Sequence, residues 1–182
     1  NVTADISITV TNVEKLSDYI GVTKKSYDLK LSAVTDAEKA AAYYITGVTG
    51  VYQNEECEVV VDLSAVDFTA AGSYTITYKL AGHETVTETA TVNIYGLPDI
   101  AVAEDAVTTV SWAEDLDLTA FISALQGKIS AKDSLLADLT VELKTETVPA
   151  KNVYGFYDIA SYNVVFTATD KMGNVQEKTV QI

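Results

Sequence analysis

An internal repeat constrains the fold of this chain more than any other feature of its sequence. The segment Gly72–Tyr78 resembles Ala160–Phe166, and Thr91–Ile94 resembles Thr179–Ile182. Both matches have the same offset of 88 residues (from 74 to 162), and no gap separates them. Two separate matches at one offset rarely arise by chance, so we expect two structural units of similar length.

The junction between the two units falls at residues 95–99, where Gly96 and Pro98 interrupt a strand-like pattern. We therefore predict one domain over residues 1–96 and a second over residues 97–182. A link this short leaves the domains little freedom, which predicts an elongated pair.

Apolar and polar side chains alternate along the closing part of each unit. In the first unit the alternation covers residues 73–80 and 85–94, with a turn at 81–84 between them. In the second unit it covers residues 162–168, followed by a turn at 170–174. This period of two predicts strands with one buried face, joined as hairpins. We expect further strands at residues 5–10, 27–34, 57–63, 100–103, 107–110 and 138–143.

Two stretches have the S/T-x-x-E spacing that is typical of a helix N-terminus, Thr35–Glu38 and Ser111–Glu114. After the second stretch, apolar residues recur at helical intervals from Leu118 to Leu125, and Gly127 provides a stop. We predict one or two short helices in a chain that is otherwise β. Strands at short spacing with a closing hairpin predict a sandwich of two sheets in each unit.

Charge and composition exclude several classes of function. The chain has 26 acidic and 12 basic residues, a net charge of −14, and all of its basic residues are lysine. Such a chain repels phosphate backbones and lacks arginine, so we expect no nucleic-acid partner. The single cysteine, Cys57, and the single histidine, His83, exclude an intrachain disulfide and paired-histidine metal chemistry. No apolar run is long enough for a spanning helix, and residues 1–5 lack the pattern of a signal peptide.

Residues Tyr162–Asn174 read Y-N-V-V-F-T-A-T-D-K-M-G-N. This stretch resembles the Y-x-V-x-F/Y-x-A-x-D-x-x-G-N hairpin that closes bacterial immunoglobulin-like repeats, and Gly72–Tyr78 is similar to the same region. Asp133–Thr140 is similar to the family's D-x-x-x-G-D-L-T segment, with Ala137 where glycine is usual. The first unit lacks the D-x-x-G-N turn, so its membership rests on the internal repeat.

The resemblance implies two tandem immunoglobulin-like β-sandwich domains, the first with an atypical first half. Such domains occur in exported or cell-surface bacterial proteins as spacers, stalks or adhesion domains. We therefore expect an extracellular, non-catalytic module that binds a protein or glycan partner, as a monomeric part of a larger protein. The alternative is a carbohydrate-binding accessory module of a polysaccharide-active surface protein.

Aromatic residues outside the predicted strands are the candidates for binding. Tyr43, Tyr52 and Tyr154 are left open as surface residues that could contact a sugar or a protein. We expect Phe156 and Trp112 to lie in the core instead, with Trp112 at the start of the second helix.

Two acidic residues are candidates for a calcium site. Asp133 and Asp138 lie in a predicted loop, and calcium needs several hard oxygen ligands at once. The chain has no D-x-D-x-D-G loop, and acidic clusters are more often solvated faces. We therefore expect no cofactor, with calcium as the exception to test. A lysine crosslink to asparagine or aspartate inside a domain also stays open, because no pattern selects a pair.

Tyr74 and Tyr162 stand just before the penultimate strand of each unit. A tyrosine in this place can form a tyrosine corner, in which its hydroxyl bonds the backbone a few residues back. Cys57 alternates with apolar residues and is expected to face the core. His83 falls in a hairpin turn, which is a poor platform for a catalytic triad.

Overall fold

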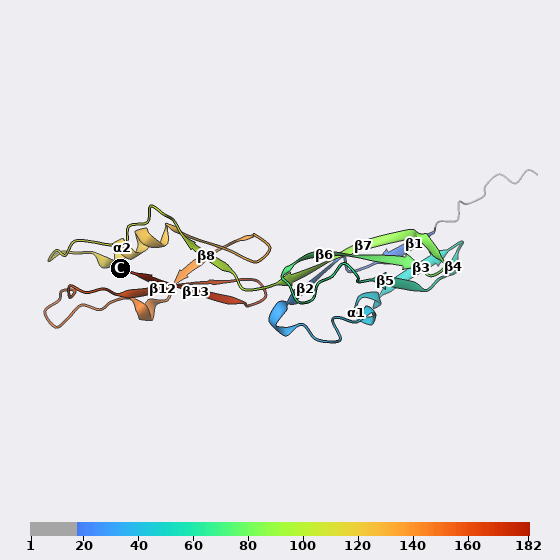
Figure 1. Cartoon of the computed structure of the whole chain (residues 1–182), viewed down its shortest axis with the longest axis horizontal. Coiled ribbons are helices and arrows are strands. Elements are labelled where there is room, and N and C mark those ends of the chain that lie inside the picture. Colours follow the sequence, from blue (N-terminus) through green and yellow to red (C-terminus); the bar gives the residue numbers. More distant parts are fainter. Residues whose placement is uncertain (1–17) are drawn as a thin grey trace, which may run out of the picture.

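The computed structural model describes residues 18–182, so the strand expected at residues 5–10 lies outside the described residues. The described chain consists of β-strands in several sheets with short helices, and it has the predicted fold class: mainly β, with sandwich-like packing of sheets. Figure 1 shows two groups of strands end to end along the long axis of the molecule.

The first group is built on a four-stranded sheet and a three-stranded sheet. The larger sheet has the order β2-β7-β6-β5, with β2 parallel to β7 and the other pairs antiparallel; the smaller has the order β1-β3-β4. Its elements are β1 (Tyr19–Val22), β2 (Ser26–Lys30), the 3₁₀ helix η1 (Leu31–Ala33), α1 (Ala41–Ile45), β3 (Val48–Tyr52), β4 (Glu55–Glu56), β5 (Val59–Asp62), β6 (Gly72–Leu80) and β7 (His83–Tyr95).

The alternation in β6 shows why this group forms a core. Ile76, Tyr78 and Leu80 are buried on one face of the strand, as are Val92 and Ile94 on β7. Burial of each large apolar side chain contributes roughly 1.5–3 kcal/mol. The expected hairpin between residues 73–80 and 85–94 is therefore confirmed, with β6 and β7 paired along most of their length.

The second group contains two three-stranded sheets, in the orders β10-β9-β8 and β11-β12-β13, with all pairs antiparallel. Its elements are β8 (Asp99–Val102), α2 (Leu118–Gln126), β9 (Ile129–Lys132), β10 (Asp138–Leu139), β11 (Val141–Leu143), the 3₁₀ helix η2 (Thr145–Thr147), β12 (Asn163–Thr169) and β13 (Val175–Gln181). Val164, Phe166 and Ala168 of β12 form the buried row predicted from the alternation.

Helix α2 closes one side of this second core. Leu118, Ile122 and Leu125 are buried at the helical intervals read from the sequence. Asp117 begins the helix, because its Oδ1 accepts a hydrogen bond from the Ala120 backbone N–H at 2.9 Å.

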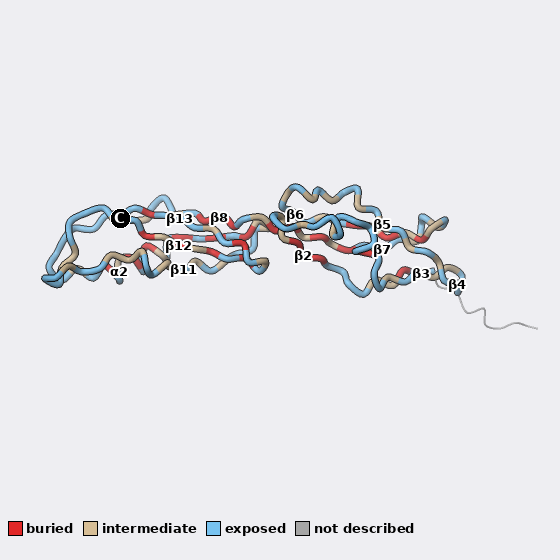
Figure 2. The backbone as a smooth tube through the Cα atoms, turned by 90° about the horizontal axis from the view of Figure 1, so that it is seen from below, coloured by how far each residue is buried: buried red, intermediate tan, exposed pale blue. Residues whose placement is uncertain are grey.

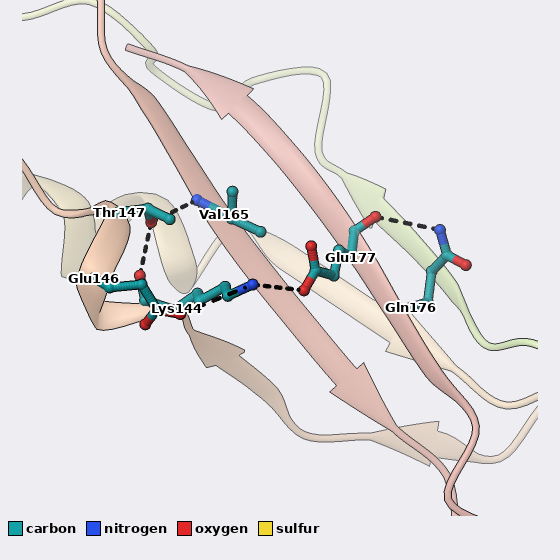
Figure 3. Close-up of polar contacts among 6 residues, drawn as sticks. All are labelled: Lys144, Glu146, Thr147, Val165, Gln176 and Glu177. Atoms are coloured by element: carbon teal, nitrogen blue, oxygen red, sulfur yellow. Dashed lines mark hydrogen bonds and ion pairs between the residues drawn. The ribbon is translucent and has the colours of Figure 1, made fainter.

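A side-chain network fastens η2 to the sheet beside it (Figure 3). The Thr147 hydroxyl donates to the Lys144 carbonyl at 2.7 Å and accepts from the Val165 N–H of β12 at 3.0 Å. The Lys144 Nζ also reaches Glu177 Oε1 of β13 at 2.9 Å. One 3₁₀ turn is therefore tied to two strands, which fixes the end of β11.

Two hydrophobic clusters fill the two groups, and each takes its residues from one side of residue 96. Figure 2 shows buried stretches along the strands of both groups and also where the groups meet. The domain boundary placed between residues 96 and 97 stays a prediction. No helix among residues 18–182 is long and apolar enough to cross a membrane.

Four local predictions differ from the structure. Residues 107–110 form no strand, and Trp112 is half exposed and outside any helix, so both its expected core position and its helix-starting role are wrong. The Thr35–Glu38 capping box does form, with the Thr35 N–H donating to Glu38 Oε2 at 2.7 Å. It is followed by a turn, and α1 begins only at Ala41.

Candidate functional site

The three tyrosines predicted to bind a partner lie in three separate places. Tyr43 is on α1 with its ring 5.1 Å from that of Tyr44. Tyr52 ends β3 and stacks on His83, with ring centroids 3.4 Å apart. Tyr154 is 80% exposed in an irregular segment of the second group. The structure thus forms no shared aromatic strip from these three, and their role in binding stays a prediction.

A buried tyrosine network explains why α1 stays on the first core. The hydroxyls of Tyr27 and Tyr78 both hydrogen-bond the Tyr44 carbonyl, at 3.2 and 3.1 Å. The Tyr44 hydroxyl in turn donates to the Glu38 carbonyl at 2.7 Å. Burial raises the pKa of Tyr44 to about 12 and also raises the pKa of Tyr78, so both of these hydroxyls stay neutral at ordinary pH. The network is a structural clamp with no free group for chemistry.

Tyr74 and Tyr162 make equivalent contacts in the two groups. The Tyr74 hydroxyl donates to the Ala70 carbonyl at 3.1 Å, and the Tyr162 hydroxyl donates to the Asp158 carbonyl at 2.6 Å. In both cases the acceptor lies four residues earlier, which is the tyrosine-corner geometry described from the sequence. Each bond ties the loop before a long strand to that strand.

The two aspartates considered for calcium face different partners. Asp133 is buried, and its Oδ1 accepts the backbone N–H groups of Leu135 and Ala137 at 2.8 and 2.9 Å. Asp138 is exposed and forms an ion pair with Lys132 at 2.8 Å, which lowers its pKa. Among residues 18–182 no group of three histidine, cysteine or acidic residues could hold a metal ion.

The Asp133 loop belongs to a five-residue geometry that recurs in the second group. In each copy the first side chain accepts from the third and fifth backbone N–H groups, and the fourth residue has a positive φ. The copies are residues 133–137, 152–156 and 170–174, with φ values of 72° at Leu136, 85° at Gly155 and 71° at Gly173. Asparagine and aspartate favour such turns because their side chains can replace a backbone acceptor.

Two of these loops meet the end of the first group and form a joint. The Ser134 hydroxyl accepts the Gly96 N–H at 2.9 Å, and the Asn174 side-chain amide donates to the Tyr95 carbonyl at 3.3 Å. Asp170 and Asn174 are only 5% and 4% exposed, so these polar groups are largely removed from water. Every buried side-chain nitrogen and oxygen within residues 18–182 has a hydrogen-bond partner.

Two lysines add contacts at the rim of the joint. Lys171 Nζ lies 2.8 Å from Asp28 Oδ2 of β2 and 4.7 Å from the centre of the Tyr95 ring. Lys30 Nζ of β2 donates to the Gly173 carbonyl at 3.0 Å. Partial burial raises the pKa of Asp28, but the hydrogen bonds from Lys171 and Asn93 outweigh it, so its pKa is lowered overall. The bond to Asp28 raises the pKa of Lys171.

A second candidate lies at the far end of the second group, which we call the distal pocket. It has a volume of about 200 Å³ and lies between the irregular segments 103–117 and 148–162. It is lined by Thr109, Val110, Trp112, Leu116, Leu118, Tyr157, Asp158, Ile159, Ala160, Ser161, Tyr162 and Ile182. The Trp112 indole N–H donates to the Tyr157 carbonyl at 3.1 Å, which ties one segment to the other.

No model of a protein family matches this chain, and no curated protein matches it. Among solved structures it is similar to extracellular cadherin domains 1–4 of protocadherin gamma B7, with 12% sequence identity and a TM-score of 0.28. The match covers 92% of this chain and 50% of that chain, so this chain spans about half its length. A likeness this distant carries no argument about function.

Sequence reasoning missed the joint and the distal pocket. Asp28 and Lys171 are far apart in the sequence, and no local pattern connects them. A signal did exist for the loops, because each begins with Asp or Asn and two have Gly at the fourth position. No described lysine is buried, so the geometry selects no pair for a crosslink within a core.

Proposed function

We propose that this chain is a pair of immunoglobulin-like modules that serves as a non-catalytic structural spacer or adhesion segment of an exported bacterial cell-surface protein. The resemblance of residues 162–174 to bacterial immunoglobulin-like repeats supports the cellular setting. The joint is the observation that carries the spacer role. A spacer has to hold its two ends apart at a defined distance, which a flexible link does not do.

The joint restrains the two groups through contacts that point in different directions. Ser134 and Asn174 hold the backbone at Gly96 and Tyr95, directly on the connecting strand. Lys171 contacts Asp28 of β2, and Lys30 of β2 contacts the Gly173 carbonyl, both at the side of the connecting strand. Bending or twisting about the link would break one set or the other. The elongated arrangement in Figure 1 is thereby maintained.

The proposal includes no cofactor and leaves the partner as a protein or glycan on a surface or matrix. Asp133 supports the first point, because its Oδ1 is already used by two backbone N–H groups. The net charge of −14 supports a soluble, extended role, since like charges oppose self-association. No arrangement of Tyr43, Tyr52 and Tyr154 favours the carbohydrate-binding alternative.

A distance measurement across the joint tests the spacer role. Spin labels at Thr89→Cys on β7 and Thr179→Cys on β13, both exposed, in a Cys57→Ser background would report the spacing of the two groups by double electron–electron resonance. We expect one narrow distance distribution. A broad or multimodal distribution would show a flexible link and refute the spacer proposal.

Paired variants connect that result to the joint. Lys30→Ala with Lys171→Ala removes the two lysine contacts between the groups, and we expect the distribution to broaden. Lys128→Ala is the matched control, because its ion pair with Asp105 lies within the second group. Equal distributions in all three proteins would show that the lysine contacts do not restrain the joint.

A further inference from the structure

The distal pocket exposes apolar side chains that no described part of the chain covers. Ile159 is 86% exposed, and Val110 and Trp112 are about half exposed around it. Val153 and Tyr154 of the neighbouring loop are also highly exposed, at 93% and 80%. Adjacent exposed apolar side chains around a hollow are typical of interaction sites on soluble domains.

One carboxylate, Asp158, lines this pocket. The exposed Asp115 and Asp117 are the sequence neighbours of the lining residue Leu116 and add negative charge to this end of the second group. The ion pairs found within residues 18–182 involve other carboxylates. Lys151, the lysine of the adjoining loop, lies over the Tyr157 ring at 5.4 Å. A partner with cationic groups around an apolar centre would therefore match this surface.

The polar groups of the pocket are poorly placed for a sugar. The Trp112 N–H is already bonded to the Tyr157 carbonyl, and Asp158 Oδ1 accepts the Asn152 side-chain amide at 2.8 Å, whereas Asp158 Oδ2 has no hydrogen-bond partner within residues 18–182. The Asp158 carbonyl accepts the Tyr162 hydroxyl. Sugar sites need convergent polar groups to bind hydroxyls, whereas most of this lining is aliphatic or already bonded.

The joint shows the same chemistry already in use within this chain. Thr91–Ile94 lies beside the joint, and the internal repeat aligns it with Thr179–Ile182, whose last residue lines the distal pocket. The two surfaces are therefore at equivalent ends of the two units. At the joint, an incoming loop places Lys171 against Asp28 beside the Tyr95 ring. The distal pocket also combines an acid, Asp158, with aromatic side chains, those of Trp112 and Tyr157.

We propose that the distal pocket binds an apolar segment of a partner protein that carries lysine or arginine beside its apolar side chains. Ile159, Val110 and Trp112 contact the apolar side chains, and Asp158 contacts a cation, with Asp115 and Asp117 adding negative charge nearby. This site goes beyond the spacer role, which depends on the other end of the second group.

Trp112 provides a direct readout, because it is the single tryptophan of the chain. We would titrate the intact chain with a short peptide that alternates lysine with leucine, and follow Trp112 emission. We expect a saturable blue shift that weakens at high salt, since screening reduces the charge contribution. A matched peptide with glutamate for lysine should give no shift. No shift with the lysine peptide, or equal shifts with both, would overturn the proposal.

Variants locate the binding to the pocket. Ile159→Ser should weaken peptide binding by about tenfold, and Asp158→Asn by about threefold, because a central apolar contact exceeds a rim charge. Val60→Ser is the control, since Val60 is an exposed apolar residue on β5 of the first group and does not line the pocket. Equal binding by all three variants, or a Trp112 shift with neutral oligosaccharides in place of the peptide, would also overturn the proposal. Circular dichroism checks that each variant is folded.

Discussion

Loops 170–174 and 152–156 have the same hydrogen-bond geometry but opposite surroundings. In each, the first side chain accepts two backbone N–H groups and the fourth residue is a glycine with positive φ. Loop 170–174 is packed into the joint, where Asp170 is 5% exposed. Loop 152–156 lies beside the distal pocket, where the equivalent residue Asn152 is only partly buried and Tyr154 is 80% exposed. One local geometry therefore serves both a closed contact and an open surface.

This difference shows that local interactions form the backbone of the loop. The residues packed around the loop then decide whether it makes a buried contact or stays exposed. An Asx-type turn needs only its own side chain and a residue that tolerates positive φ. Burial then decides the energetic weight of each hydrogen bond, because a buried group that loses its partner cannot bond water instead. The same turn should therefore be costly to disrupt at the joint and cheap to disrupt at the distal end.

Removal of the first side chain tests this contrast and has the largest expected effect. Asp170→Ala leaves the Met172 and Asn174 N–H groups and the Asn174 side-chain amide without their acceptor. We expect a loss of about 3 kcal/mol in the free energy of unfolding, measured with urea, against about 1 kcal/mol for Asn152→Ala. Val153→Ala removes a 93% exposed side chain of the same loop and is the control, for which we expect almost no loss. Equal losses for Asp170→Ala and Asn152→Ala would contradict the contrast.

The fourth position of the loops should give a smaller effect that does not depend on burial. A Cβ added at Gly155 or Gly173 would meet no atom within 4 Å, so the cost comes from the positive φ alone. We expect Gly155→Ala and Gly173→Ala each to lose about 1 kcal/mol, by thermal or urea unfolding.

Leu136 provides the reverse test, since it has a φ of 72° and its side chain is exposed. Leu136→Gly relieves the strain and should stabilise the chain by about 0.5 kcal/mol, less than the full strain because glycine also gains freedom in the unfolded chain. A loss of stability on Leu136→Gly would show that the side chain contributes more than the backbone conformation costs.

The strands could be predicted because their signal is local. The alternation that led to β6, β7, β12 and β13 reflects one buried face, and the register follows it. The predicted start of the second helix was wrong, and the reason is also local. Ser111–Glu114 has a capping spacing, but Asp117 directly precedes the periodic residues and is an equally good N-cap. Of two valid signals, the one nearer the helical pattern was correct.

The candidate sites could be predicted only in part. The tyrosine-corner hydrogen bonds of Tyr74 and Tyr162 span four residues, so the sequence contains the whole interaction. The joint brings Asp28 to Lys171, and the distal pocket brings Trp112 to Tyr157; both contacts depend on how sheets and loops pack. Tyr154 lies close in the sequence to residues that line the distal pocket, but nothing in the sequence indicated that Ile159 and Val110 would be exposed there.

The ion pair at the joint gives the smallest expected effect and one that depends on pH. The pKa of Asp28 is lowered in the folded chain from its ordinary value of 3.8, so the pair stabilises the joint above about pH 4 and is lost as pH falls through the lowered pKa. Because both side chains are partly exposed, the contribution should be below about 1 kcal/mol. We expect the distance distribution between Thr89→Cys and Thr179→Cys to broaden slightly between pH 5 and about 2.5.

Asp28→Asn should remove that pH dependence, since an asparagine side chain does not titrate and has no negative charge to pair with Lys171. A distal variant such as Asp158→Asn should leave it unchanged, because Asp158 faces no lysine within ion-pair distance. If the Asp158→Asn variant changed the pH response and the Asp28→Asn variant did not, the assignment of this response to the Asp28–Lys171 pair would be wrong. The pair at the joint is closed by a lysine of the same chain, whereas the distal acids remain available to a cation from a partner.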